Sequence, residues 1–153
     1  METTDVVKKL STLVQLDIDA IHAYEQAIEK IENVQVQDQL TRFKEDHRRH
    51  VENLSSLIQR HGGQAPEYSR DFKGFLIQGF TALRSVTGTE GALKAMKSNE
   101  LLTNKTYDEA LSWDLADDVK DVVKRNREDE RLHLNYIEKA IESRVWEAGE
   151  QVA

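Results

Sequence analysis

Two hexamers of similar sequence, EDHRRH at residues 45–50 and EDERLH at residues 128–133, lie 83 positions apart in a chain of 153 residues. Four of their six positions are identical, and the same shift aligns Tyr24 with Tyr107 without a gap. Self-similarity at a fixed shift is the mark of a repeated structural unit. The chain is therefore expected to fold from two units of similar design.

Each unit has the pattern of two antiparallel helices. Apolar residues recur at spacings of three and four, which predicts four long helices at residues 4–32, 36–61, 90–113 and 118–146. Gly62 and Gly63 resemble a helix C-cap, and Pro66 prevents the second helix from continuing. A shorter amphipathic helix is predicted at residues 71–86, and Thr89 is the expected N-cap of the third long helix.

The composition agrees with an all-α fold. Hydrophobic residues make up 39% and charged residues 32%, with one proline and seven glycines, which suits helices better than turn-rich sheets. The predicted organisation is a single domain, with one hairpin at residues 4–61, a crossover at 62–89 and a second hairpin at 90–146. Two short connections and one long one characterise the ferritin-like variant of the four-helix bundle.

The charge and cysteine content exclude several function classes. The net charge is −7, whereas binding to nucleic acid depends on a basic surface. There are no cysteines, so disulfides and thiolate metal sites are excluded. The amino-terminal segment lacks a secretory apolar core, and no apolar run reaches the ~18 residues of a membrane span. We expect a cytoplasmic protein without nucleic-acid or membrane partners.

Ionisable side chains interrupt all four apolar stripes. On a bundle with short turns, these positions come to the same level, because their offsets amount to less than one turn at ~1.5 Å rise per residue. Asp19 lies off the stripe of the first helix and is expected at the surface. Six residues are therefore expected to meet inside the bundle: Asp17, His47, His50, Glu100, Glu130 and His133.

Three carboxylates and three imidazoles in one core level point to a bound divalent metal. A buried charge is costly unless it is paired or bound to a metal. The alternative from the residues alone is a metal-free network of carboxylates and protonated imidazoles. Carboxylate and imidazole ligands suit iron or manganese, and zinc also fits.

These motifs resemble the ferritin-like superfamily, in particular bacterioferritin and rubrerythrin. In that pattern, a lone Glu on the first and third helices joins a Glu-x-x-His on the second and fourth, with a Tyr seven residues after each lone Glu. The segments DIDAIHAY (residues 17–24) and ELLTNKTY (residues 100–107) match the lone carboxylate with its tyrosine, and ERLH (residues 130–133) matches the pair. The resemblance covers residues 10–141, and the crossover helix and the length are closer to a small, poorly characterised bacterial branch than to storage ferritins.

The resemblance implies roles for these residues. The six would bind one or two iron ions, with Asp17, His47 and His50 on one ion, Glu100 and His133 on the other, and Glu130 between them. Around them, Asp46 and Asp129 would orient the histidines of the opposite hairpin, and Tyr24 and Tyr107 would hydrogen-bond ligands or donate an electron.

Two positions depart from the family pattern. His47 stands where the family has a bridging Glu, and Asp17 is one methylene shorter than Glu. An imidazole offers one lone pair to one metal, so His47 cannot bridge as a carboxylate does. The expectation is an asymmetric dinuclear centre, or one strongly held ion with a weaker neighbour.

Two functions remain open from the sequence. The first is an iron-binding oxidoreductase that reacts with dioxygen or peroxide. The second is a non-enzymatic stress or structural protein whose metal site only stabilises the bundle. A homodimer or larger homo-oligomer is also expected. The apolar face that Phe72, Phe75 and Phe80 form on the crossover helix either caps the end of the bundle or, where exposed, provides the homodimer surface.

Overall fold

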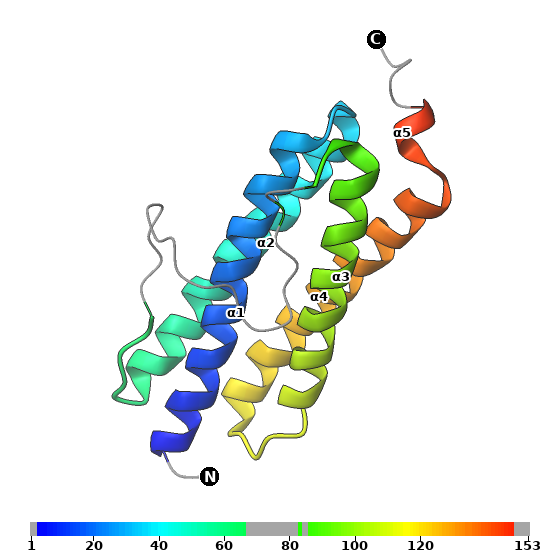
Figure 1. Cartoon of the computed structure of the whole chain (residues 1–153). Coiled ribbons are helices and arrows are strands. Elements are labelled where there is room, and N and C mark those ends of the chain that lie inside the picture. Colours follow the sequence, from blue (N-terminus) through cyan, green and yellow to red (C-terminus); the bar gives the residue numbers. More distant parts are fainter. Residues whose placement is uncertain (1–2, 67–82, 84–85, 149–153) are drawn as a thin grey trace.

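The computed structural model describes residues 3–66, 83 and 86–148, which form helices and no strands (Figure 1). The predicted all-α four-helix bundle is confirmed. Its helices are α1 Thr3–Lys30, α2 Val34–Arg60, α3 Gly88–Ala110, α4 Asp117–Glu142 and the short α5 Val145–Ala148. The first three long helices match the expected ranges to within about three residues at each end.

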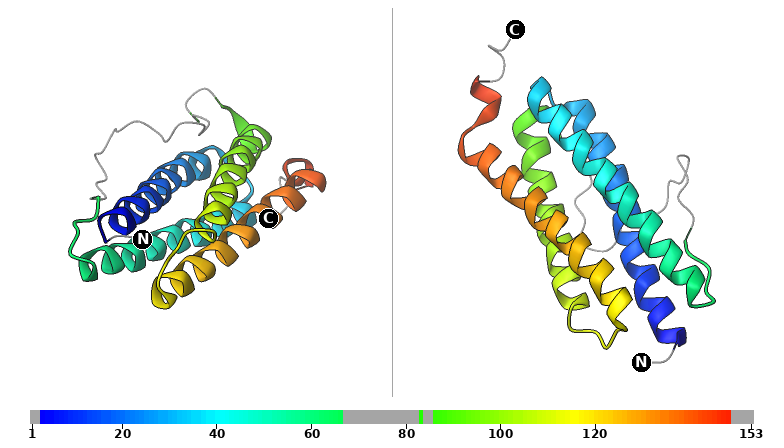
Figure 2. Two further views of the ribbon diagram at one scale, coloured as in Figure 1. Left: turned by 90° about the horizontal axis from the view of Figure 1, so that it is seen from below. Right: turned by 180° about the vertical axis from the view of Figure 1, so that it is seen from behind.

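The four long helices pack as two antiparallel hairpins, α1 with α2 and α3 with α4 (Figure 1). Helix α1 also packs along α3, and α2 along α4, as the views from below and behind show (Figure 2). Helix α2 ends at the end of the bundle where α1 begins, whereas α3 begins at the opposite end. The connection from α2 to α3 therefore spans the length of the bundle, as a crossover requires.

Local signals fix the ends of α2. The side chain of Asn33 accepts a hydrogen bond from the N–H of Val36 (3.1 Å), which is an N-cap. At the other end, Gly62 has φ +80°, and the N–H groups of Gly62 and Gly63 donate to the carbonyls of Gln59 and Ile58. This is a Schellman motif, so the predicted glycine C-cap is confirmed.

Thr89 has a different role from the one expected. Helix α3 begins two residues earlier than predicted, at Gly88, with Thr87 in the N-cap position. The buried Thr89 hydroxyl instead accepts a hydrogen bond from the N–H of Glu32 (3.0 Å). Thr89 thereby ties the turn between α1 and α2 to the start of α3. The N-cap prediction was wrong because this tertiary hydrogen bond takes the hydroxyl.

The fourth helix is shorter than predicted. It ends at Glu142, and Arg144 takes a positive φ of 51° before α5 begins at Val145. The change of direction lets the partly buried Val145 and Trp146 pack on the hydrophobic core at this end of the bundle. Continuous periodicity predicted one helix because the break depends on this packing rather than on a glycine or proline.

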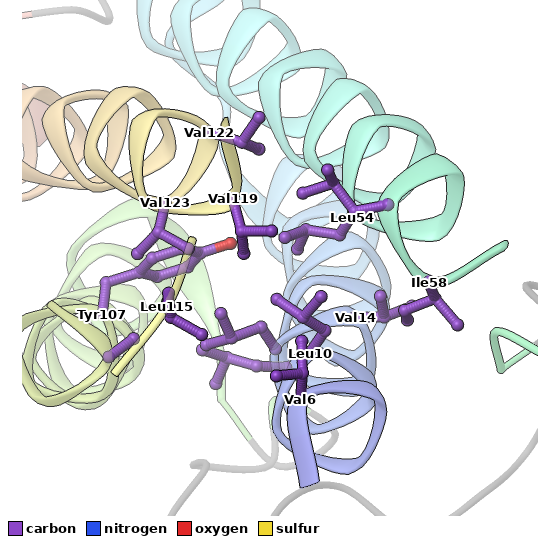
Figure 3. Close-up of a cluster of buried hydrophobic side chains, with 14 of the residues drawn as sticks. Val6, Leu10, Val14, Leu54, Ile58, Tyr107, Leu115, Val119, Val122 and Val123 are labelled. Carbon is purple, nitrogen blue, oxygen red and sulfur yellow. The ribbon is translucent and has the colours of Figure 1, made fainter. Parts of the chain in front are cut away.

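The core consists of two hydrophobic clusters with a polar layer between them. One cluster lies around Leu10, Leu54 and Val119, and Figure 3 shows its side chains converging from all four helices. The other lies around Ala27 and Leu93, nearer the turn between α1 and α2. On α2, α3 and α4 the candidate metal ligands fall between the residues of these two clusters, and on α1 Asp17 lies at the edge of the first cluster, before the residues of the second.

The predicted crossover helix falls mostly on residues that lie outside the described part of the chain. The aromatic face with Phe72, Phe75 and Phe80 is among them, so the homodimer stays a prediction. Leu83 and Val86, which are described, are not helical. Leu83 is buried in the cluster around Leu93, so the crossover contributes at least this side chain to the core.

Substitution of the C-capping glycine should weaken the bundle modestly. Gly62→Ala should lower the free energy of unfolding by about 1 kcal/mol, because an L-residue at positive φ is strained. Urea unfolding measures this, with the exposed Gln64→Ala as a control that should change little. An unchanged or higher stability of Gly62→Ala would contradict the assigned role.

Candidate metal centre

The six residues predicted to meet in the core do so. They come from all four long helices, and none is more than 1% exposed. They are Asp17 on α1, His47 and His50 on α2, Glu100 on α3, and Glu130 and His133 on α4. The matched depth inferred from the hairpin turns is therefore present in the structure. Asp19, expected at the surface, is also buried, and it accepts a hydrogen bond from Gln15 (3.0 Å).

Asp17 is the most heavily hydrogen-bonded carboxylate of the six. Its Oδ1 lies 2.6 Å from Nδ1 of His47 and 3.0 Å from Nδ1 of His50. Its Oδ2 accepts a hydrogen bond from the hydroxyl of Tyr107 (2.5 Å), which comes from the opposite hairpin. Three groups from two other helices thus converge on one side chain, and they fix its position.

The other two carboxylates are less well satisfied. Glu100 Oε1 accepts a hydrogen bond from the Tyr24 hydroxyl (2.7 Å) and lies 3.4 Å from Nε2 of His47. Glu130 Oε1 lies 3.2 Å from Nδ1 of His50, and its Oε2 lies 3.4 Å from Nδ1 of His133. These Glu130 contacts lack hydrogen-bond geometry, so both oxygens are buried without a hydrogen-bond partner.

Two aspartates hold the outer nitrogens of two histidines. His50 Nε2 lies 2.8 Å from Asp129, and His133 Nε2 lies 2.9 Å from Asp46, each across the pair of helices α2 and α4. Such contacts fix the orientation of an imidazole and direct its other nitrogen inward. These are the contacts that the expected orienting role of both aspartates requires. Arg49 contacts both, at 3.5 Å from Asp46 and closer to Asp129.

The charges in the layer stabilise one another. Burial alone would raise the pKa of Asp17, but the attraction of His50 and hydrogen bonds from both histidines lower it to about 2. Interactions with His133 and His47 likewise overcome burial and hold the pKa of Glu100 well below its usual range. Burial would lower the pKa of His47, but Glu130, Asp17 and Glu100 raise it to about 9.

The same carboxylates act on the remaining histidines and on the tyrosines. Despite burial, nearby acidic groups raise the pKa of His50 and of His133 well above the ordinary value of 6.5. Burial and the neighbouring carboxylates also raise the pKa of Tyr24 and of Tyr107. The tyrosines are therefore neutral hydrogen-bond donors.

The donor atoms gather in two overlapping groups that can hold a metal ion. One group is Asp17, His47, His50 and Glu130, and the other is His47, Glu100, Glu130 and His133. Within each group the ligand atoms lie within 4.8 Å of one another. Four buried atoms that face these groups have no hydrogen-bond partner: Glu100 Oε2, Glu130 Oε1, Glu130 Oε2 and His133 Nδ1. Buried polar atoms are rarely left unpaired, so their chemistry fits a bound cation.

Sequence comparison supplies a family. The model of the Domain of unknown function (DUF2383) matches residues 5–112. The chain belongs to this family. The DUF2383 match includes Asp17, His47, His50 and Glu100, whereas Glu130 and His133 follow it on α4. No curated protein matches the sequence.

Residues that the sequence did not single out connect the centre to the surface of this DUF2383 protein. Asn53 and Asn126 exchange hydrogen bonds of 3.1 and 3.2 Å, and Asn126 also donates to the Tyr107 hydroxyl (3.4 Å). A surface pocket of about 480 Å³ lies over this pair, lined by Arg49, Asn53, Lys124, Arg125, Asn126, Glu128 and Asp129. Asn126 interrupts an apolar stripe, which is a signal for a buried polar role, whereas Asn53 and Arg49 carry none.

No described helix is sufficiently long and apolar to pass through a membrane.

The tyrosine hydrogen bonds should contribute measurably to stability. Tyr107→Phe should lower the free energy of unfolding by about 2 kcal/mol, because it removes a buried hydrogen bond to a charged carboxylate. Chemical denaturation measures this, with Tyr136→Phe as the control for loss of a hydroxyl from a half-buried ring. Equal effects of the two substitutions would contradict the role given to Tyr107.

Proposed function

We propose that this chain is a single ferritin-like domain that binds iron or manganese in the buried carboxylate and histidine cluster. The observation that carries the proposal is the set of buried, inward-facing donor atoms without hydrogen-bond partners. His133 illustrates it, since Asp46 holds its outer nitrogen while its inner nitrogen faces two carboxylates. A metal ion would satisfy these atoms together.

The donor set favours particular metals. Carboxylate oxygens and imidazole nitrogens suit Fe(II) and Mn(II), and zinc also binds such ligands. The proposed ligands are drawn from the six core residues, with Asp46 and Asp129 as the orienting carboxylates. Loss of a proton from each ligating imidazole would accompany binding, because a metal ligand must be deprotonated at the donor atom.

We further propose that iron bound in this cluster reacts with dioxygen or hydrogen peroxide. Iron would supply one electron per Fe(II) to either oxidant. Support comes from Tyr24 and Tyr107, whose hydroxyls donate to Glu100 and Asp17 and so lie directly beside the proposed centre. The surrounding hydrophobic clusters exclude water from both sides of the layer.

A second candidate is a stress or structural protein in which the metal only stabilises the bundle. The observation that favours it is His47, which stands between Asp17 and Glu100 and pairs with both. Three imidazoles and three carboxylates also balance in charge without any metal when the imidazoles are protonated. Such a cluster can persist without turnover.

Anaerobic titration with Fe(II), followed by dioxygen or peroxide, separates these candidates. The expected result is Fe(II) binding, then growth of Fe(III) absorption with consumption of the oxidant, in the wild type. The double variant His50→Ala, His133→Ala should lose both, whereas His61→Ala, at the C-cap of α2, should retain both. Binding without oxidation would favour the structural candidate, and equal behaviour of the wild type and the double variant would refute both.

A further inference from the structure

The two ligand groups are not equivalent, because both carboxylate oxygens of Asp17 already accept hydrogen bonds. Three donors point at its two oxygens: His47 Nδ1 at 2.6 Å, His50 Nδ1 at 3.0 Å and the Tyr107 hydroxyl at 2.5 Å. An ionised carboxylate can only accept hydrogen bonds, so each of these groups donates to it. Asp17 therefore has little capacity left for a metal ion.

The contact with Asp17 determines which nitrogen of His47 is available. A neutral imidazole has one N–H and one lone pair. Since Nδ1 donates to Asp17, the lone pair belongs to Nε2, which lies 3.4 Å from Glu100 Oε1. The His47–Asp17 pair therefore resembles the His133–Asp46 pair. In each pair, a carboxylate holds one ring nitrogen of the histidine, and the second ring nitrogen faces the interior of the layer.

His50 has no nitrogen directed at an empty position. Its Nε2 lies 2.8 Å from Asp129, and its Nδ1 lies 3.0 Å from Asp17. Both nitrogens are therefore engaged with carboxylate oxygens. The same Nδ1 lies 3.2 Å from Glu130 Oε1, so the His50 imidazole occupies the space between Asp17 and Glu130.

Three of the four unpaired atoms fall on the other side of the layer, and the fourth, Glu130 Oε1, lies 3.2 Å from His50 Nδ1. Glu100 Oε2, both oxygens of Glu130 and Nδ1 of His133 are buried without hydrogen-bond partners. These three residues belong, with His47, to the second ligand group, and only Glu130 also belongs to the first. Two carboxylates in the second group would balance the charge of one divalent ion.

We infer that the cluster binds a single divalent ion per chain, held by His47 Nε2, Glu100, Glu130 and His133, and that Asp17 is a positioning residue for His47. The inference rests on the proposed metal-binding function and narrows it. The histidine at position 47, where the ferritin-like pattern has a bridging carboxylate, is then the feature that sets the number of ions. An imidazole serves one ion, where a carboxylate bridges two.

Titration with Co(II), whose visible absorption reports its ligands, tests this assignment on the intact chain. Wild type should bind about one Co(II) per chain, since a neutral His47 has one lone pair to give. Asp17→Asn should keep that number and weaken the affinity by about 10- to 100-fold, as expected for loss of an orienting partner. Glu100→Gln should weaken binding far more and change the spectrum of any ion that remains. Asp19→Asn, a buried aspartate on the same helix, is the matched control and should leave affinity unchanged.

Two results would overturn the inference and leave the proposed function in place. One is tight binding of two ions per wild-type chain, and the other is loss of binding in Asp17→Asn as complete as in Glu100→Gln. Because the wild-type ratio needs no variant, the test remains decisive if a substituted chain fails to fold. Absence of binding in the folded wild type would overturn the inference and the proposed function together.

Discussion

In a metal-free preparation, the free energy of unfolding should fall by at least about 3 kcal/mol when the pH is raised from 6.5 to above 9, at about 1.4 kcal/mol per pKa unit. The cause is His47, whose pKa is raised from 6.5 to about 9 by the carboxylates around it. A group with a raised pKa in the folded state stabilises the protein fully below its unfolded value. That contribution is lost as the pH rises through the folded value. His50 and His133 act in the same direction.

Acidic pH should act through the carboxylates with the opposite sign. The pKa of Asp17 is lowered from 3.8 to about 2, so its contribution is present above 3.8 and is lost as the pH falls through 2. The pKa of Glu100 is also lowered, so its contribution to stability is likewise lost at acidic pH. The metal-free protein should therefore be most stable between about pH 4 and 6.5, the window that these shifts leave.

Urea unfolding in the presence of a chelator, at several pH values across this range, measures the effect. His47→Gln should give a shallower decline above pH 6.5, because it removes the titrating group. His61→Gln, at the C-cap of α2, should follow the wild type. A stability that is constant or rises from pH 6.5 to 9 would contradict the ionic network assigned to the metal-free layer.

Addition of metal should reverse the loss of stability at neutral and alkaline pH. At a free concentration of about 100 times the dissociation constant, Mn(II) or anaerobic Fe(II) should stabilise the fold by about 2.7 kcal/mol. For a chain of this size, the melting temperature should rise by roughly 5 to 10 °C. The rise should increase with pH above 6.5, because the ligating imidazoles must lose protons before they bind.

Thermal unfolding of each variant is measured with and without metal. The difference between the two melting temperatures of one variant gives the stabilisation by metal, separate from any loss of stability that the substitution itself causes. His133→Ala should lose the shift, since it removes an inward-facing nitrogen and leaves the rest of the layer intact. His61→Ala should keep it. A shift of equal size in His133→Ala would mean that the metal binds elsewhere on this acidic chain.

Much of the fold was predictable because the determining signals are local or periodic. The stripes at spacings of three and four set the four helices, and the repeat at a shift of 83 set the pairing of the hairpins. The same periodicity identified six buried polar positions, since a charged residue on an apolar stripe must enter the core. Gly62 marked the end of α2 for a conformational reason, because its φ is positive.

The remaining features depend on tertiary contacts that a one-dimensional pattern does not contain. Asp19 lies off the stripe yet is buried, because α1 is covered on more than one face here, where all of residues 16–21 are buried. Thr89 bonds across to Glu32 rather than capping its own helix. Which nitrogen of His47 faces which carboxylate is likewise set by the positions of α1 and α3 around α2. It is this last contact that distinguishes the two ligand groups.

Whether the buried cluster binds a metal ion is tested most directly by elemental analysis after anaerobic loading with Fe(II) or Mn(II) and removal of free metal by gel filtration. The predicted result is about one ion per wild-type chain, one for the four proposed donor residues. The variant Glu130→Gln, His133→Ala should retain almost none, and Asp19→Asn should match the wild type. A ratio near zero in the folded wild type, or an unchanged ratio in the double variant, would contradict a metal centre in this layer.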